Sequence, residues 1–186
     1  MRRDDPHSAL ADELLGVRCL LGEAAAFDEL VERWHEPLGR YVRRLVDGED
    51  AAADALQDVW LRVLRAMPGL RDPRRLRAWL FGIARRAVLD RVRRRYAEPA
   101  PVALEDAELP APEADADLAE AIALMREELA RLPFAEREAL VLFYLDELSL
   151  AQIAEVLAVP VGTVKSRLHR ARGLLRRHVT AKGVEP

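Results

Sequence analysis

The sequence predicts an all-α protein made of two small helical domains joined by a linker. Ala, Leu, Arg and Glu dominate the 186 residues, and aromatic residues make up only 5%. Straight-chain residues of this kind lose little rotamer freedom in a helix. Apolar residues recur at helical spacing in both halves of the chain, and this period is lost only in a central stretch rich in proline and acids.

The first domain, residues 10–96, is expected to hold four helices. Gly48 ends the second of them, and Pro68, Gly69 and Pro73 mark a loop before the fourth. Apolar side chains at helical spacing predict the helices near residues 10–21, 24–46, 50–67 and 74–95.

Residues 97–117 are expected to form a flexible linker. Four prolines lie there among alanines and acids, without a helical period. About 20 residues reach at most about 70 Å, which is roughly 20 base pairs of DNA.

The second domain, residues 118–179, carries the pattern of a helix-turn-helix. Ser149 and Gln152 form a capping box, and Pro160 suits the first turn of the last helix. A capped helix, a short turn and a basic helix in this order are typical of DNA-binding proteins. The helices are expected near residues 118–131, 134–146, 149–157 and 160–178.

The net charge of −3 conceals a segregation of charge along the chain. Residues 71–95 hold ten arginines against two acids, residues 98–120 hold eight acids and no base, and residues 161–182 hold seven bases and no acid. Two basic blocks that flank an acidic one are compatible with binding to nucleic acid despite the acidic total.

The last helix has one apolar face and one polar, basic face. At 100° per residue, the apolar face faces the domain core and comprises Val161, Val164, Leu168, Ala171 and Leu175. The polar face is either a solvated basic surface or a surface that reads base edges and grips phosphates. The capped helix before it and the absence of acids favour DNA recognition. The polar face and its flanks comprise Gly162, Thr163, Lys165, Ser166, His169, Arg170, Arg172, Arg176 and Arg177.

The second domain carries three distinctive strings, LPFAEREAL at 132–140, IAEVL at 153–157 and VGTVKSRLHRAR at 161–172. Together they resemble region 4 of extracytoplasmic-function sigma factors. The resemblance implies that the last helix reads the −35 promoter element, with Lys165 and Arg170 as the first choices for discrimination. Arg167 lies toward the core side, where it either forms a salt bridge or grips phosphate. The implied −35 contacts are Thr163, Lys165, Ser166, Arg167, His169, Arg170 and Arg172.

The first domain resembles regions 2.1 and 2.2 of the same family. FDELV at 27–31, followed by residues 38–45, resembles region 2.1, and DALQDVW at 54–60 resembles region 2.2. The resemblance implies docking on the β′ clamp helices of RNA polymerase, although a solvated polar face would also explain these side chains. The implied polymerase contacts are Asp54, Gln57, Asp58, Leu61 and Arg62.

WLFGIARR at 79–86 and DRVRRR at 90–95 resemble regions 2.3 and 2.4. The resemblance implies that this segment, with the loop 70–75, melts and reads the −10 element by holding flipped bases. Arg86 stands where many relatives have Asn. Because an arginine side chain cannot accept a hydrogen bond, either the −10 sequence preference differs from that of those relatives or Arg86 contacts phosphate only. Trp79 is either a stacking platform or, as its spacing favours, part of the core. The implied −10 contacts are Arg71, Arg74, Arg75, Arg77, Arg86, Arg93 and Arg94.

The implied partners are core RNA polymerase, through its β′ clamp helices and β flap, promoter DNA and an anti-sigma factor. Scattered histidines, the single Cys19 and the lack of a phosphate-binding Gly loop predict no catalytic site, no metal site and no cofactor. No signal peptide or membrane span is readable, so the expected location is the cytoplasm. A helix-turn-helix regulator that does not join polymerase is the main alternative, but it would need a receiver or ligand domain in place of residues 10–95.

Overall fold

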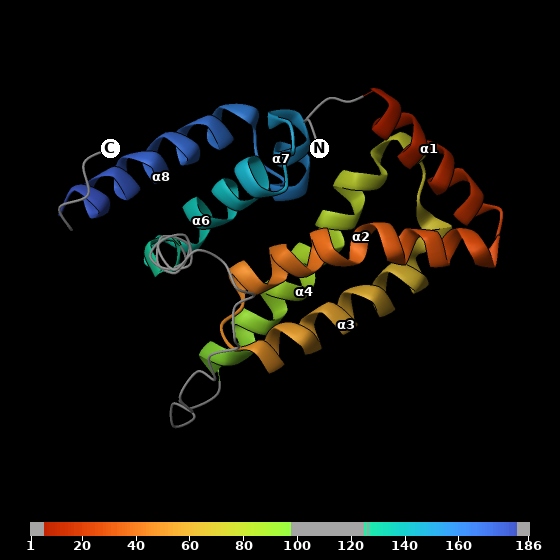
Figure 1. Ribbon diagram of the computed structural model, residues 1–186, viewed down its shortest axis with the longest axis horizontal. Helices are drawn as coiled ribbons and strands as arrows, with labels where there is room; N and C mark the ends of the chain where they lie inside the picture. The colour runs from red at the N-terminus through yellow and green to blue at the C-terminus, as the bar shows by residue number, and fades with distance from the viewer. Residues whose placement is uncertain (1–5, 98–124, 126, 182–186) are drawn as a thin grey trace, which may run out of the picture.

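The structure, a computed structural model, describes residues 6–97, 125 and 127–181 (Figure 1). Helices and turns account for these residues, and no strand occurs among them. The all-α prediction is therefore confirmed. The expected linker, beyond its first residue, and most of the helix expected at 118–131 lie outside the described residues.

The N-terminal domain consists of α1 (Pro6–Leu20), α2 (Ala24–Leu45), α3 (Glu49–Ala66) and α4 (Leu76–Ala97). Two short 3₁₀ turns, η1 (Met67–Gly69) and η2 (Pro73–Arg75), occupy the loop that the prolines predicted between α3 and α4. Gly48 separates α2 from α3 with a φ of 87°, a conformation that a side chain would strain. The four predicted helices are present, with ends displaced by at most a few residues.

The core of this domain is built on the apolar stripe of α2. Trp34 and Tyr41 of this stripe both pack edge-to-face on Phe81 of α4, with ring centroids 6.2 and 5.5 Å apart. Such aromatic pairs contribute about 0.5–1.5 kcal/mol each beyond the burial of their area. They fix α4 against α2 and so position the arginines of α4. The buried stripe comprises Leu30, Trp34, Leu38, Tyr41, Val42 and Leu45.

The C-terminal domain contains α6 (Phe134–Leu140), a π-helical turn η3 (Val141–Leu145), α7 (Leu150–Leu157) and α8 (Val161–Ala181). The capping box is present: the Gln152 N–H donates to Ser149 Oγ at 3.3 Å, and the Ser149 N–H donates to Gln152 Oε1 at 2.9 Å. The sequence predicted one helix over 134–146. Its last turn is instead widened, because the Asp146 N–H bonds to the carbonyl five residues earlier.

Three of the apolar residues predicted on the inner face of α8 anchor the helix. Val164, Leu168 and Ala171 are buried, and Leu175 packs partly buried against the core. Val161 was also expected in this face but remains 39% exposed. It occupies the first position of α8, at the turn, where the neighbouring helices cover less of the helix.

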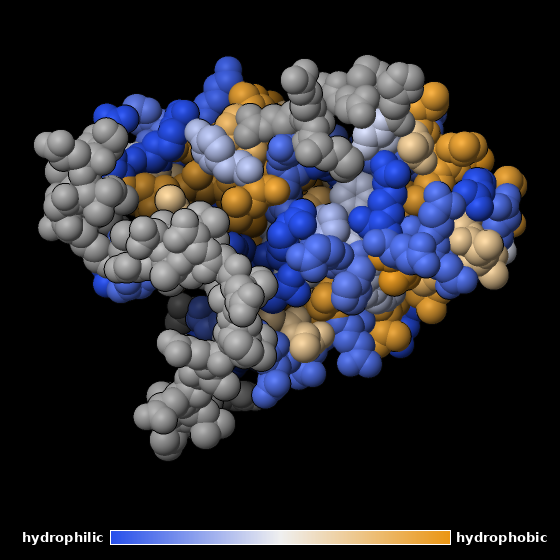
Figure 2. All heavy atoms as spheres, viewed as in Figure 1, coloured by the Kyte–Doolittle hydropathy of each residue, from blue (hydrophilic) through white to orange (hydrophobic). Residues whose placement is uncertain are grey.

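The two domains are packed against each other. The beginning of α4 contacts α7, and α2 contacts α6 and η3, so the buried residues of both domains form one continuous cluster. Figure 2 shows apolar side chains gathered on the surface at the α1 end of the molecule, where Leu10, Leu14 and Leu21 are exposed. Among the described helices, none combines the length and the hydropathy that a membrane crossing requires.

Candidate nucleic-acid interface

The outer face of α8 is the first candidate surface. Because the three buried anchors hold the opposite face, the polar side chains of the first turns of α8 project away from the core. The Ser166 hydroxyl donates to the Thr163 carbonyl at 2.9 Å and stays accessible. Of the seven residues predicted to contact the −35 element, Thr163 and Arg167 are half-buried, and five are exposed: Lys165, Ser166, His169, Arg170 and Arg172.

Two arginines of α8 have acidic neighbours on α6. Arg170 Nε lies 3.3 Å from Oε1 of the nearly buried Glu136, while 62% of the Arg170 side chain is exposed. Burial raises the pKa of Glu138, and half-buried Arg167 is close enough to act in the opposite direction by favouring the charged carboxylate. Arg170 therefore offers a partly oriented guanidinium to a ligand, whereas Arg167 also interacts electrostatically with the buried Glu138.

A shallow cavity of about 280 Å³ lies farther along α8. It is lined by Gly173 and Leu174 together with His169, Arg170 and Arg177. Arginines beside an apolar lining suit a phosphate-bearing ligand that lies along the helix.

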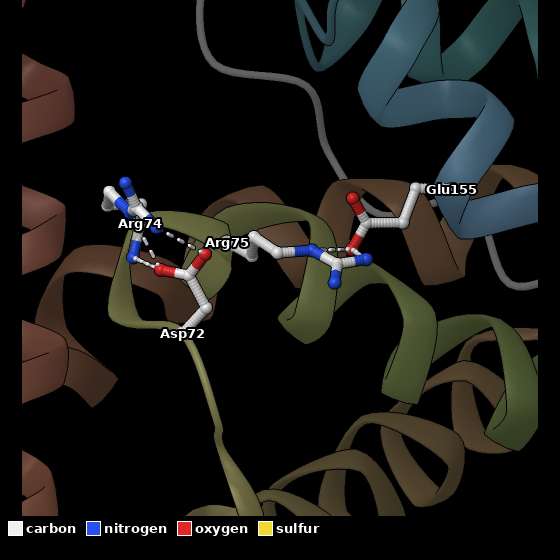
Figure 3. Close-up of polar contacts among 4 residues, drawn as sticks. All are labelled: Asp72, Arg74, Arg75 and Glu155. Atoms are coloured by element: carbon white, nitrogen blue, oxygen red, sulfur yellow. Dashed lines mark hydrogen bonds and ion pairs between the residues drawn. The ribbon is translucent and has the colours of Figure 1, made fainter.

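The second candidate surface follows η2 and the outer side of α4. Asp72 organises its start, since Asp72 Oδ1 accepts hydrogen bonds from the backbone N–H and the Nε of Arg74, at 3.1 and 2.9 Å (Figure 3). The Arg74 side-chain hydrogen bonds hold the pKa of Asp72 below its ordinary value. Six of the seven predicted −10 arginines are exposed; besides Arg75 and Arg94, which are described below, they are Arg71, Arg74, Arg86 and Arg93.

Two other predicted −10 arginines instead contact the C-terminal domain. Arg75 reaches Glu155 of α7, with Nη2 and Nε of Arg75 at 2.6 and 2.9 Å from Glu155 Oε1 (Figure 3). Arg77 donates to the backbone carbonyl of Asp146. Trp79 is half-buried and packs against the core, as its spacing favoured.

A groove of about 390 Å³ between α3 and α4 is the third surface. Four of the five predicted polymerase contacts line it: Asp54, Gln57, Asp58 and Leu61. The fifth, Arg62, is held by Asp58 at 2.7 Å and Asp90 at 2.8 Å, which raises the pKa of Arg62. Arg94 was predicted among the −10 contacts, but it lines this groove.

A buried polar cluster that was not predicted from the sequence lies between the domains. Glu138, only 1% exposed, accepts hydrogen bonds from the Tyr41 hydroxyl at 2.9 Å and from Arg85 Nε at 3.0 Å. Burial raises the pKa of Glu138, and burial beside this carboxyl raises the pKa of Tyr41 strongly. Tyr41 on an apolar stripe was the available signal, since a buried hydroxyl needs a partner.

Known proteins match both domains. The profiles of "Sigma-70 region 2" and "Sigma-70, region 4" match residues 30–98 and 122–175. The chain is 39% identical to the ECF RNA polymerase sigma factor SigM of Mycobacterium tuberculosis (strain H37Rv), over 92% of this chain and 85% of SigM. It is 30% identical to the ECF RNA polymerase sigma factor SigW of Bacillus subtilis (strain 168), over 85% of this chain and 91% of SigW.

Two solved structures share the fold. CnrH, in complex with the cytosolic domain of CnrY, superposes with a TM-score of 0.72 at 28% identity, over 92% of this chain and 98% of CnrH. The sigma factor RpoE of Bartonella quintana, in complex with the anti-sigma factor NepR, gives a TM-score of 0.71 at 25% identity, over 83% of this chain and 96% of RpoE. With its motifs, its two matched regions and these relatives, the chain belongs to the extracytoplasmic-function sigma factors of the sigma-70 family.

Proposed function

We propose that the three surfaces carry three different functions of a sigma factor: binding of core polymerase, recognition of the −10 element and recognition of the −35 element. Sigma factors are non-enzymatic initiation factors that direct RNA polymerase to specific promoters, and this chain shares that function with its family. In our proposal, residues 10–96 bind core polymerase and the −10 element, residues 97–117 are the linker, and residues 118–179 read the −35 element. The chain acts in the cytoplasm, and the polymerase carries out the chemistry.

The observation that carries this proposal is the geometry of α7 and α8. A capped α7, a turn and the buried anchors of α8 leave Lys165, Ser166, His169 and Arg170 exposed near the start of a helix. In helix-turn-helix proteins, residues in this part of the recognition helix contact base edges in the major groove. Arg and Lys suit guanine, and Ser suits several base edges.

The arginines of η2 and α4 are the proposed −10 contacts. Arg71, Arg74 and Arg93 are exposed and can follow the backbone of an opened strand. Arg86 is also exposed, and because a guanidinium only donates hydrogen bonds, it is proposed to grip phosphate.

The groove between α3 and α4 is the proposed docking site for the β′ clamp helices. Leu61 offers an exposed apolar anchor, and the carboxylates of Asp54 and Asp58 surround it. An apolar centre with a polar rim is the usual build of a protein interface. The β flap is proposed to contact the C-terminal domain. Because CnrH and RpoE form complexes with CnrY and with the anti-sigma factor NepR, an anti-sigma factor is a further proposed partner.

Transcription in vitro tests this function. The chain is mixed with core polymerase and a genomic promoter library, and transcripts are compared with those of core polymerase alone. A set of promoters that share −35 and −10 sequences is the expected result. If no promoter gains transcripts, the proposed function is wrong. Elution of the chain apart from core polymerase would favour a regulator that does not join polymerase.

A further inference from the structure

Glu136 contacts the outer face of α8 although it belongs to a different helix. It is the third residue of α6, and α6 packs on α8 (Figure 1). Glu136 Oε1 lies 3.3 Å from Nε of Arg170, and the Glu136 side chain is 11% exposed while that of Arg170 is 62% exposed. The acid is therefore held inside the packed domain, whereas the guanidinium that it contacts extends to the surface.

We propose that Glu136 is a positioning residue, which directs Arg170 to a base edge instead of a phosphate. Phosphate contacts carry no sequence information directly, whereas contacts with base edges do. Glu136 thus sets the base preference of the chain through Arg170, without belonging to the helix that enters the groove. This inference rests on the proposed −35 role of Arg170.

The geometry of the guanidinium supports this role. A guanidinium carries its N–H groups in a rigid, planar fork, and an acid at Nε leaves the edge formed by Nη1 and Nη2 to a ligand. Guanine presents O6 and N7 side by side in the major groove, and such an edge can donate to both atoms. The ion pair at Nε of Arg170 therefore keeps the edge that suits guanine available.

The charge of Glu136 acts in the same direction. The attraction between a basic side chain and phosphate is electrostatic and independent of sequence. A carboxylate beside Arg170 reduces that attraction, whereas the hydrogen bonds to a guanine edge depend on direction as well as on charge. Lys165 and Arg172 are exposed on the same helix, and within the described part of the chain neither forms an ion pair with an acid. Glu136 therefore distinguishes one basic side chain of α8 from the others.

A neutral substitution, Glu136→Gln, tests this inference in the holoenzyme, since it keeps the shape of the side chain and removes its charge. Competition measures the affinities for a promoter from the library and for the same promoter with each −35 base pair replaced in turn. Discrimination at one base pair is expected to fall about fivefold, a part of what one arginine–guanine contact provides. The mismatched promoter should be bound at least as tightly as by the unaltered holoenzyme, because a negative charge beside the outer face of α8 is lost. Damage to the domain would instead weaken binding to both promoters and would overturn the inference.

Two further variants separate positioning from other roles of the acid. Glu127→Gln removes the same charge from an ion pair with Arg131, 2.6 Å long and outside the predicted reading set, and should keep the full discrimination. In an Arg170→Ala background, Glu136→Gln should cause no further loss at that base pair. Equal discrimination in Glu136→Gln and Glu127→Gln would overturn the inference, and so would an equal loss with and without Arg170. Failure of the proposed −35 role is seen separately, as an unchanged promoter preference in Arg170→Ala alone.

Discussion

Arg170, a proposed −35 contact, is partly oriented before DNA binds. Its Nε is 3.3 Å from Glu136, and most of the side chain is exposed at the outer face of α8. A charge-assisted contact of this kind limits the rotamers that the guanidinium samples. Less conformational entropy is then lost when Arg170 binds a guanine edge or a phosphate.

Removing this side chain should affect DNA recognition alone. Arg170→Ala is expected to weaken −35-dependent binding of the holoenzyme about tenfold, as loss of one base-reading arginine does, and to relax the preference at one base pair. Competition with −35 variants measures this, and co-elution with core polymerase should be unchanged. Arg176→Ala, an exposed arginine outside the predicted reading set, is the control. Unchanged promoter preference would remove Arg170 from that set.

Asp146 is a buried acid in an unfavourable environment. Burial raises its pKa from an ordinary 3.8 to about 7, although Arg40 of α2 and Arg77 of α4 act in the opposite direction. The folded chain therefore holds a proton that the unfolded chain releases. The contribution to stability is complete below about pH 4 and is lost as the pH rises toward about 7.

Asp146→Asn should remove this pH dependence. In the unaltered chain the free energy of unfolding in urea is expected to be on the order of 2 kcal/mol lower at about pH 7 than at about pH 5, because ionisation penalises the buried carboxyl. The Asn variant stays neutral and should lack that part of the decrease. Identical pH profiles for the two proteins would mean that Asp146 does not titrate as a buried acid.

At the scale of the elements, α3 and α4 together form a surface that neither makes alone. Leu61 of α3, 45% exposed, lies in the groove with Arg91 and Arg94 of α4. The network of Arg62, Asp58 and Asp90 ties the two helices together beside it. The groove thus depends on the packing of α4 against α3.

Leu61→Asp should disrupt polymerase binding without unfolding the domain. The substitution puts a charge in the proposed apolar anchor, so the affinity for core polymerase is expected to fall at least about tenfold, as for an interface hot spot. Fluorescence titration with core polymerase measures the effect. Leu20→Asp, at the last residue of α1 and with a similar exposed fraction of 38%, is the control. Equal affinities for the two variants would place the interface elsewhere.

The helical period of the apolar residues was sufficient to predict most helices, because it depends only on residues that are close together in the sequence. The helix expected at 24–46 is found at Ala24–Leu45, and the one expected at 160–178 at Val161–Ala181. The π-helical turn at Val141–Leu145 was not predicted, since one extra residue in a turn barely changes the apolar pattern around it.

The candidate sites also differ in how far the sequence alone could predict them. The exposed face of α8 and the polar face of α3 follow from geometry within one helix, so their residues could be grouped from the sequence. The partners of Arg75 and Arg77 lie 80 and 69 residues away in the chain. They depend on how the domains dock, and local pattern does not determine that docking.

At the scale of the whole molecule, segregated charge is arranged in space as well as in sequence. The basic block of residues 71–95 forms η2 and α4, and three acidic residues of the C-terminal domain lie against it: Glu138, Asp146 and Glu155. The second basic block forms α8 and keeps its predicted reading face exposed. A net charge of −3 is thus compatible with two separate DNA-binding surfaces.

In the proposed function, α8 and the arginines of α4 read two elements of one promoter at a set separation. In vitro transcription with core polymerase, from a promoter found in the library, tests this when about five base pairs are inserted between its −35 and −10 elements. That is about half a turn of DNA and moves one element to the opposite side of the helix. Loss of the transcript is expected, while the same insertion upstream of the −35 element should have no effect. Undiminished transcription from the altered spacer would contradict two-element reading.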